Sequence, residues 1–136
     1  MNMKSEQEKR DELYQKWKEL VNMSARELEL YLKTDEAKED AGLSAKEAKK
    51  LGIKRGYDSG KAIVRMKRKG VKKWTKKDWE WAKRQVSFNS RMLGAFKRVK
   101  ARKGKYEALF DSKTGKRTPL HQSLLIWGHN PMKYWS

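Results

Sequence analysis

The chain has 136 residues, of which 37% are hydrophobic and 38% are charged, and its formal net charge is +18. It contains no cysteine, which excludes disulfides, thiol chemistry and thiolate metal sites. No apolar stretch approaches the ~18 residues that a membrane-spanning helix requires. Six Trp, five Tyr and three Phe supply large buried areas, which a disordered sequence lacks. We expect an all-α fold, a compact single domain of five to six short helices without membrane contact.

The charge is unequally distributed along the chain. Residues 1–50 hold 11 Lys/Arg against 12 Asp/Glu, whereas residues 51–136 hold 24 against 5. We distinguish a charge-balanced helical half (1–50), a strongly basic helical region (51–105) and a C-terminal turn and short helix (106–136). Because so large a positive charge opposes compaction, it indicates a polyanionic partner. We expect nucleic acid, with DNA favoured over RNA.

Three Ser-x-x-Glu pairs mark helix starts in the first half: Ser5–Glu8, Ser24–Glu27 and Ser44–Glu47. The first helix carries apolar residues at the spacing of one face, namely Leu13, Trp17, Leu20 and Val21. The second has the apolar face Leu28, Tyr31 and Leu32, and it continues or restarts at Thr34 and stops at Gly42. The third is short and ends near Gly52. We expect this half to complete the core rather than to bind nucleic acid.

A fourth helix is expected to start at Asp58 or Ser59 and to run to about Lys69, before Gly70. Its apolar stripe consists of Ala62, Ile63 and Met66. A start at Ser59 would also leave free N–H groups that hold a phosphate. The segment 44–66 has part of the spacing of a helix-turn-helix motif, an alternative in which Lys61 occupies a position that is normally buried and apolar.

The strongest local signal is a helix start with a capping box of Thr75 and Asp78 and a hydrophobic staple of Trp74 and Trp79. The helix that follows ends at Gly94, or is only weakened there and continues to Lys103. Residues 106–117 are expected to form a turn or short hairpin. Thr118 and Pro119 are typical N-cap and N1 residues for a last helix that runs through Trp127 and stops at Gly128.

Two groups of cations are candidates for phosphate contacts. On the long helix, four cations recur every seven residues and would follow one line: Lys77, Arg84, Arg91 and Arg98. On the helix before it, and in the connection between the two, lie Lys61, Arg65, Arg68, Lys69, Lys72 and Lys73. The mixture of Lys and Arg favours backbone contact over a base code. The alternative is an ordinary solvated helix face.

Nothing in the sequence indicates an active site, a cofactor or a metal centre. The two histidines, His121 and His129, have few carboxylates near them and no cysteine, so structural roles are expected. A Mg²⁺-dependent nuclease would need several carboxylates, which the basic region lacks. Of the tryptophans, Trp17, Trp74, Trp79 and Trp127 are expected in the core, while Trp81 and Trp135 remain candidates for base stacking.

Four motifs together resemble a family of small uncharacterised bacterial and phage proteins that are commonly labelled DNA-binding. The motifs are Leu32-Lys33-Thr34-Asp35-Glu36, Gly56-Tyr57-Asp58-Ser59-Gly60-Lys61-Ala62-Ile63-Val64, Thr75-Lys76-Lys77-Asp78-Trp79 and Arg84-Gln85-Val86. Ala37 and Tyr57 depart from the usual Ser and His of that pattern. The resemblance implies DNA binding in the cytoplasm or nucleoid. The tail after Gly104 is similar to tails of phage and large-virus proteins, which implies a second possibility: a virion component, self-associated or bound to a viral structural partner, whose basic face meets packaged genome or an acidic protein.

Overall fold

The computed structural model describes residues 3–40, 46, 50–51 and 56–134. The elements in chain order are α1 (Glu6–Leu20), α2 (Ala25–Leu32), the π-helical turn η1 (Glu36–Asp40), α4 (Gly56–Lys69), the 3-10 turn η2 (Val71–Lys73), α5 (Lys76–Lys103), α6 (Lys105–Leu109), α7 (Pro119–Ile126) and the 3-10 turn η3 (Pro131–Tyr134). Among the described residues the single β interaction is an isolated bridge between Phe110 and Arg117. The expected all-α fold is confirmed.

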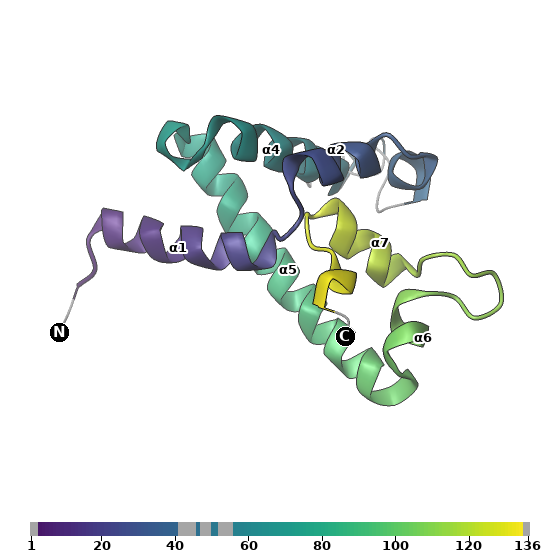
Figure 1. Cartoon of the computed structure of the whole chain (residues 1–136). Coiled ribbons are helices and arrows are strands. Elements are labelled where there is room, and N and C mark those ends of the chain that lie inside the picture. The colour runs from purple at the N-terminus through teal and green to yellow at the C-terminus, as the bar shows by residue number, and fades with distance from the viewer. Residues whose placement is uncertain (1–2, 41–45, 47–49, 52–55, 135–136) are drawn as a thin grey trace.

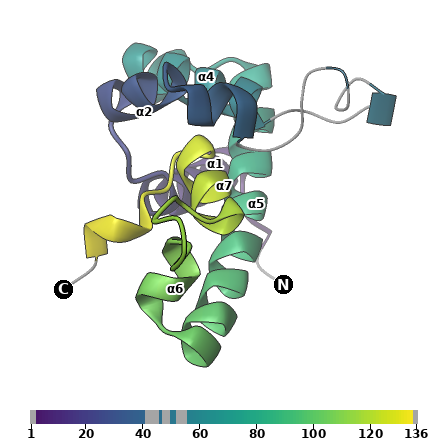
Figure 2. The same cartoon turned by 90° about the vertical axis from the view of Figure 1, so that its right-hand side faces the viewer.

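The 28-residue helix α5 is the element around which the others are arranged. Helix α1 crosses it, and α2 and α4 pack side by side over its N-terminal end (Figure 1). Helices α6 and α7 lie on one side of α5, and the other side of its C-terminal half forms an edge of the molecule (Figure 2). The long helix therefore presents one side to the core and another to solvent.

Most of the expected helix ends are confirmed. Ser24 and Glu27 form a reciprocal capping box, as do Thr75 and Asp78. The rings of Trp74 and Trp79 meet edge to face at 4.8 Å, in the staple position. Gly94 does not end α5, which continues to Lys103. The remaining confirmed ends are the Ser5 cap of α1, the restart at Thr34, and the Thr118 cap with Pro119 at the start of α7. The turn expected over 106–117 is confirmed only after Phe110, because residues 106–109 belong to helix α6.

The expected start of the fourth helix is wrong. Helix α4 begins at Gly56 instead of being capped by Asp58 or Ser59. A Cβ at Gly56 or Gly60 would come within 2.9 Å of atoms of Ile126, so the first turns of α4 press against the end of α7. Ser59 is fully buried and accepts a hydrogen bond of 3.2 Å from Gln85 Nε2. No free helix start exists there to hold a phosphate.

Two expected features lie largely outside the described residues: the helix after Ser44, with its end near Gly52, and the stop at Gly42. The turn of the alternative helix-turn-helix motif also lies there. Within the described part, Lys61 is exposed on α4, as its charge requires.

The core consists of two adjoining clusters. The larger one joins α1, α2, α4 and α7 through Trp17, Leu28, Ile63, Met66 and Ile126, all of which are almost completely buried. The smaller one holds Phe96, Ala108, Leu109 and Leu124 under the C-terminal half of α5. Leu13 packs against the larger cluster, so residues of the first half are integral to it.

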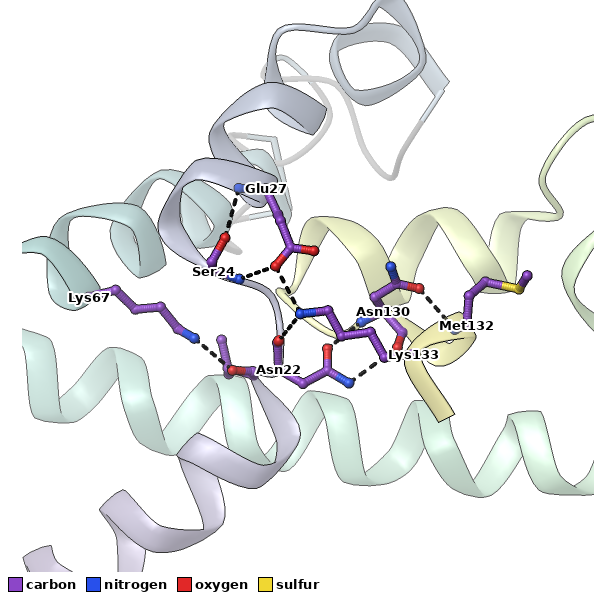
Figure 3. Close-up of polar contacts among 8 residues, drawn as sticks. Asn22, Ser24, Glu27, Lys67, Asn130, Met132 and Lys133 are labelled. Atoms are coloured by element: carbon purple, nitrogen blue, oxygen red, sulfur yellow. Dashed lines mark hydrogen bonds and ion pairs between the residues drawn. The ribbon is translucent and has the colours of Figure 1, made fainter. Parts of the chain in front are cut away.

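The segment after α7 is held against the connection between α1 and α2 by charged hydrogen bonds (Figure 3). Lys133 Nζ donates to Asn22 O at 2.6 Å and to Glu27 Oε1 at 2.8 Å, and Lys67 Nζ donates to Val21 O at 2.9 Å. The Lys133 hydrogen bond, assisted by the Ser24 backbone N–H, lowers the pKa of Glu27 to about 2. These lysines serve the fold rather than a partner.

Candidate functional site

The four cations at seven-residue intervals, Lys77, Arg84, Arg91 and Arg98, are here called the α5 stripe. All four are exposed, and no ion pair joins them to a carboxylate within the described ranges. Seven residues correspond to about 10.5 Å along a helix and to a rotation of only about 20° from the same direction. The opposite side of α5 carries its buried residues, Asp78, Ala82, Gln85, Asn89 and Phe96. The stripe therefore forms a row on the solvent side of one helix.

Carboxylates are scarce along this row. From Trp81 to Lys105 the sequence has nine Lys/Arg and no Asp or Glu. Asp78, near the start of α5, is buried and forms an ion pair with Lys69. Burial alone would raise the pKa of Asp78, but hydrogen bonds from Lys69 and Thr75 outweigh it and lower the pKa below its ordinary value. Acidic groups of the protein therefore offset little of the positive electrostatic potential along the stripe.

The predicted cations of α4 and η2 form a different group. Lys61 and Arg65 line a hollow of about 430 Å³ between α2 and α4, to which α5 contributes no lining residue. Lys61 Nζ lies 5.0 Å from the centroid of the Tyr57 ring. Lys72 and Lys73 are exposed in the short connection between the helices. The ten predicted residues thus do not all belong to one surface.

Two predicted residues have partners within the protein. Arg68 Nη1 lies 2.7 Å from Glu29 Oε2 on α2, and Lys69 pairs with Asp78 across the α4–α5 turn. The Arg68 side chain keeps 54% of its surface exposed, whereas that of Lys69 keeps 33%. Lys69 is therefore a structural residue in the first place, because it compensates a buried carboxylate.

Sequence reasoning missed two cations beside the α2–α4 hollow. Lys33 and Lys38 line it together with Lys61 and Arg65. They belong to the charge-balanced half, where the composition gave no sign of a cationic surface. The apolar face of α2, which predicts its packing on another helix, was the only available signal.

The aromatic side chains lie mainly where the sequence predicts them. Trp17, Trp74 and Trp127 are buried in the larger cluster, and Trp79 packs against it. Trp81 is half-buried, and the Arg84 guanidinium carbon lies 5.7 Å from its ring centroid. Such a contact holds the arginine close to the helix while leaving its charge at the surface. Trp135, the other stacking candidate, lies outside the described residues.

Both histidines have structural partners. His121 Nδ1 lies 2.9 Å from Leu109 O, and His129 Nδ1 lies 2.6 Å from Leu20 O. Burial lowers the pKa of each ring below its ordinary value. Within the described part of the chain, no group of three or more His, Asp and Glu residues is placed to hold a metal ion. None of the described helices combines the length and apolarity needed to cross a membrane.

Comparison with known proteins corrects the resemblance drawn from the motifs. Residues 16–110 match a family described as "Protein of unknown function (DUF3140)". That description carries no DNA-binding label, so the label attached to the resemblance is wrong and lends no support to a function. No curated protein and no solved structure matches the chain. Because the match spans more than half of the 136 residues, the chain belongs to the DUF3140 family of proteins of unknown function.

Proposed function

We propose that this protein binds duplex DNA through its phosphate backbone, along the α5 stripe and with little dependence on base sequence. The observation that carries the proposal is the stripe itself. It consists of four exposed cations without carboxylate partners in the described structure, evenly spaced on one unbroken helix. From Lys77 to Arg98 the row extends about 32 Å, which is long enough to meet several phosphates of a duplex.

The rigidity of α5 supports the proposal. The helix is anchored at both ends of the row, by its capping box at Thr75 and by the cluster that contains Phe96. Cations on a preorganised helix lose less conformational entropy on binding than cations on a loop. Arginine supplies three of the four positions, and its guanidinium binds phosphate oxygens in pairs.

The burial of the two α5 amides supports a weak dependence on base sequence. Asn and Gln are the side chains that pair with adenine in the major groove. The two amides of α5, Gln85 and Asn89, are fully buried and hydrogen-bonded within the protein. Because both amides lie in the core, the exposed face of α5 presents mainly charged side chains to a partner. Lys61 and Arg65, on their separate surface, add to the positive field that attracts the duplex.

A salt titration of the full chain on a fluorescent duplex tests the proposal. Each phosphate contact contributes about −0.9 to the slope of log K against log salt, so four contacts predict a slope of roughly −3.6. Affinity then falls roughly 100-fold between about 50 and about 200 mM salt. Two unrelated duplexes of equal length should give the same slope and affinity. A flat response, or no binding at about 50 mM salt, contradicts the proposal.

A further inference from the structure

A second hollow lies at the C-terminal half of α5, where the end of α1 and the segment after α7 meet it. Its volume is about 490 Å³, within the range of small-molecule sites. Its walls are mainly apolar and are formed by Leu20, Leu93, Phe96 and Pro131. Neither the stripe nor the α2–α4 hollow includes any of these residues.

Three lysines stand around this hollow. Lys97 and Lys100 come from α5 and Lys105 from α6, and the single acid in the lining is Glu19. The pKa of Lys105 is lowered by desolvation and, secondarily, by the charge of Lys100. Lys97 and Lys100 are exposed three positions apart on α5, so their side chains are neighbours on the helix surface, and together they offer two ammonium groups to an anion such as a phosphate.

His129 places a hydrogen-bond acceptor in the lining. Leu20 O can only accept, so His129 Nδ1 carries the proton that makes the 2.6 Å hydrogen bond. Burial keeps the ring neutral by lowering its pKa, and Nε2 is therefore an acceptor. Among the residues that the structure describes, Nε2 has no hydrogen-bond partner, and it does not belong to the fully enclosed unpaired atoms, as Oδ1 of Asn89 does. It is available to an N–H donor in the hollow that His129 lines.

We propose that this hollow binds one nucleotide, with its phosphate between Lys97 and Lys100, its base against Leu93 and Phe96, and a base N–H group donating to His129 Nε2. The proposal goes beyond the proposed function, because no member of the α5 stripe lines this hollow. A hydrocarbon chain with one carboxylate fits the apolar walls, but it leaves Nε2 without a donor. The nucleotide is either free or an unpaired unit of a strand.

Calorimetric titration of the full chain tests the inference. The probes are adenosine 5′-monophosphate, adenosine, ribose 5-phosphate and laurate. We expect the nucleotide to bind at least tenfold more tightly than either of its parts, because base and phosphate contacts act together. A single-stranded oligonucleotide that binds more tightly than the mononucleotide identifies a strand as the source, and the reverse order identifies a free nucleotide.

Paired variants locate the site. Lys97→Ala with Lys100→Ala should weaken mononucleotide binding at least tenfold, whereas the control Arg102→Ala with Lys103→Ala, exposed at the end of the same helix, should leave it unchanged. Circular dichroism melting verifies that each variant is folded. The inference would be overturned if the two variant pairs lost equal affinity for the mononucleotide. It would also be overturned if ribose 5-phosphate bound as tightly as the nucleotide, or if laurate bound and the nucleotide did not.

The proposals for the stripe and for the hollow can be tested and rejected independently. Charge reversal at Arg84 and Arg91 should abolish most duplex binding and leave mononucleotide binding intact. If the nucleotide does not bind but the duplex still shows its salt dependence, the hollow is rejected and the stripe is retained.

Discussion

The indole of Trp17 donates a hydrogen bond of 2.7 Å to Oε1 of Gln85, 68 residues further along the chain. The same amide donates to Ser59 Oγ through Nε2, so three helices share one fully buried polar group. This contact fixes the rotation of α5 about its axis. The stripe lies roughly 80–140° around the helix axis from Gln85, and this contact thereby helps to direct it to solvent.

Replacing Trp17 by Phe should destabilise the fold by about 1–3 kcal/mol, because Gln85 Oε1 loses its donor in a site closed to water. Urea denaturation followed by circular dichroism measures the change. Trp81→Phe is the control, since Trp81 is half-buried and has no such hydrogen bond among the described contacts. If the two substitutions cost the same, the Trp17–Gln85 hydrogen bond does not contribute as proposed.

The stability of the fold should decrease in acid as Glu27 is protonated. Its pKa is about 2 in the folded protein against an ordinary 4.5, so its contribution is fully present above pH 4.5 and is lost as the pH falls toward 2. Both partners are partly exposed, at 34% for Lys133 and 42% for Glu27, and solvent screening limits the contribution to about 1 kcal/mol.

The variant Glu27→Gln isolates this effect. Urea denaturation of parent and variant at several pH values should give curves that differ above pH 4.5 and converge in stronger acid. A constant difference between the two proteins across that range would show that the carboxylate charge is not involved.

Gly128 should tolerate no side chain. It has a φ of +87°, and a Cβ there would lie 2.7 Å from Val21 Cγ1 and 2.9 Å from Ile63 Cδ1. Gly128→Ala should therefore lower the free energy of unfolding by about 2–5 kcal/mol, from backbone strain and overpacking together. Gly115 is the matched control, because its φ is +73° and nothing lies within 4 Å of its Cβ position. Equal losses at the two positions would argue against the packing part of this account.

A chain that begins at Gly56 should not fold. It would lack Trp17, Val21 and Leu28, which are buried in the larger cluster. Circular dichroism should show a large loss of helix and no cooperative thermal transition. A cooperative transition near that of the full chain would mean that the first half is an accessory to the core.

Features encoded by neighbouring residues could be predicted from the sequence. The Thr75–Asp78 box and the Trp74–Trp79 staple need only residues within one helical turn of each other. The start of α4 could not be predicted, because Gly56 is fixed by its contact with Ile126, 70 positions away in the chain. Tertiary packing overrode a good local capping signal at that point.

The candidate site was predictable to the same extent. The seven-residue period of the stripe is a local property, and all of its members are exposed as expected. The pairing of Arg68 with Glu29 joins residues 39 positions apart, and no spacing rule indicates it. The hollow near His129 draws its lining from α1, α5, α6 and the segment after α7, so only the assembled fold reveals it.

The most direct test of the central claim is duplex affinity after charge reversal in the stripe, Arg84→Glu with Arg91→Glu. The control is Lys16→Glu with Arg26→Glu, which makes the same change in net charge at exposed positions of the first half. We expect the stripe variant to lose at least tenfold in affinity, with a salt slope reduced by about 0.9 for each lost contact, while the control changes little. Surface substitutions change stability by about 0.5 kcal/mol or less, so both variants should melt within a few degrees of the parent. Equal affinity of the stripe variant and the control would contradict the account.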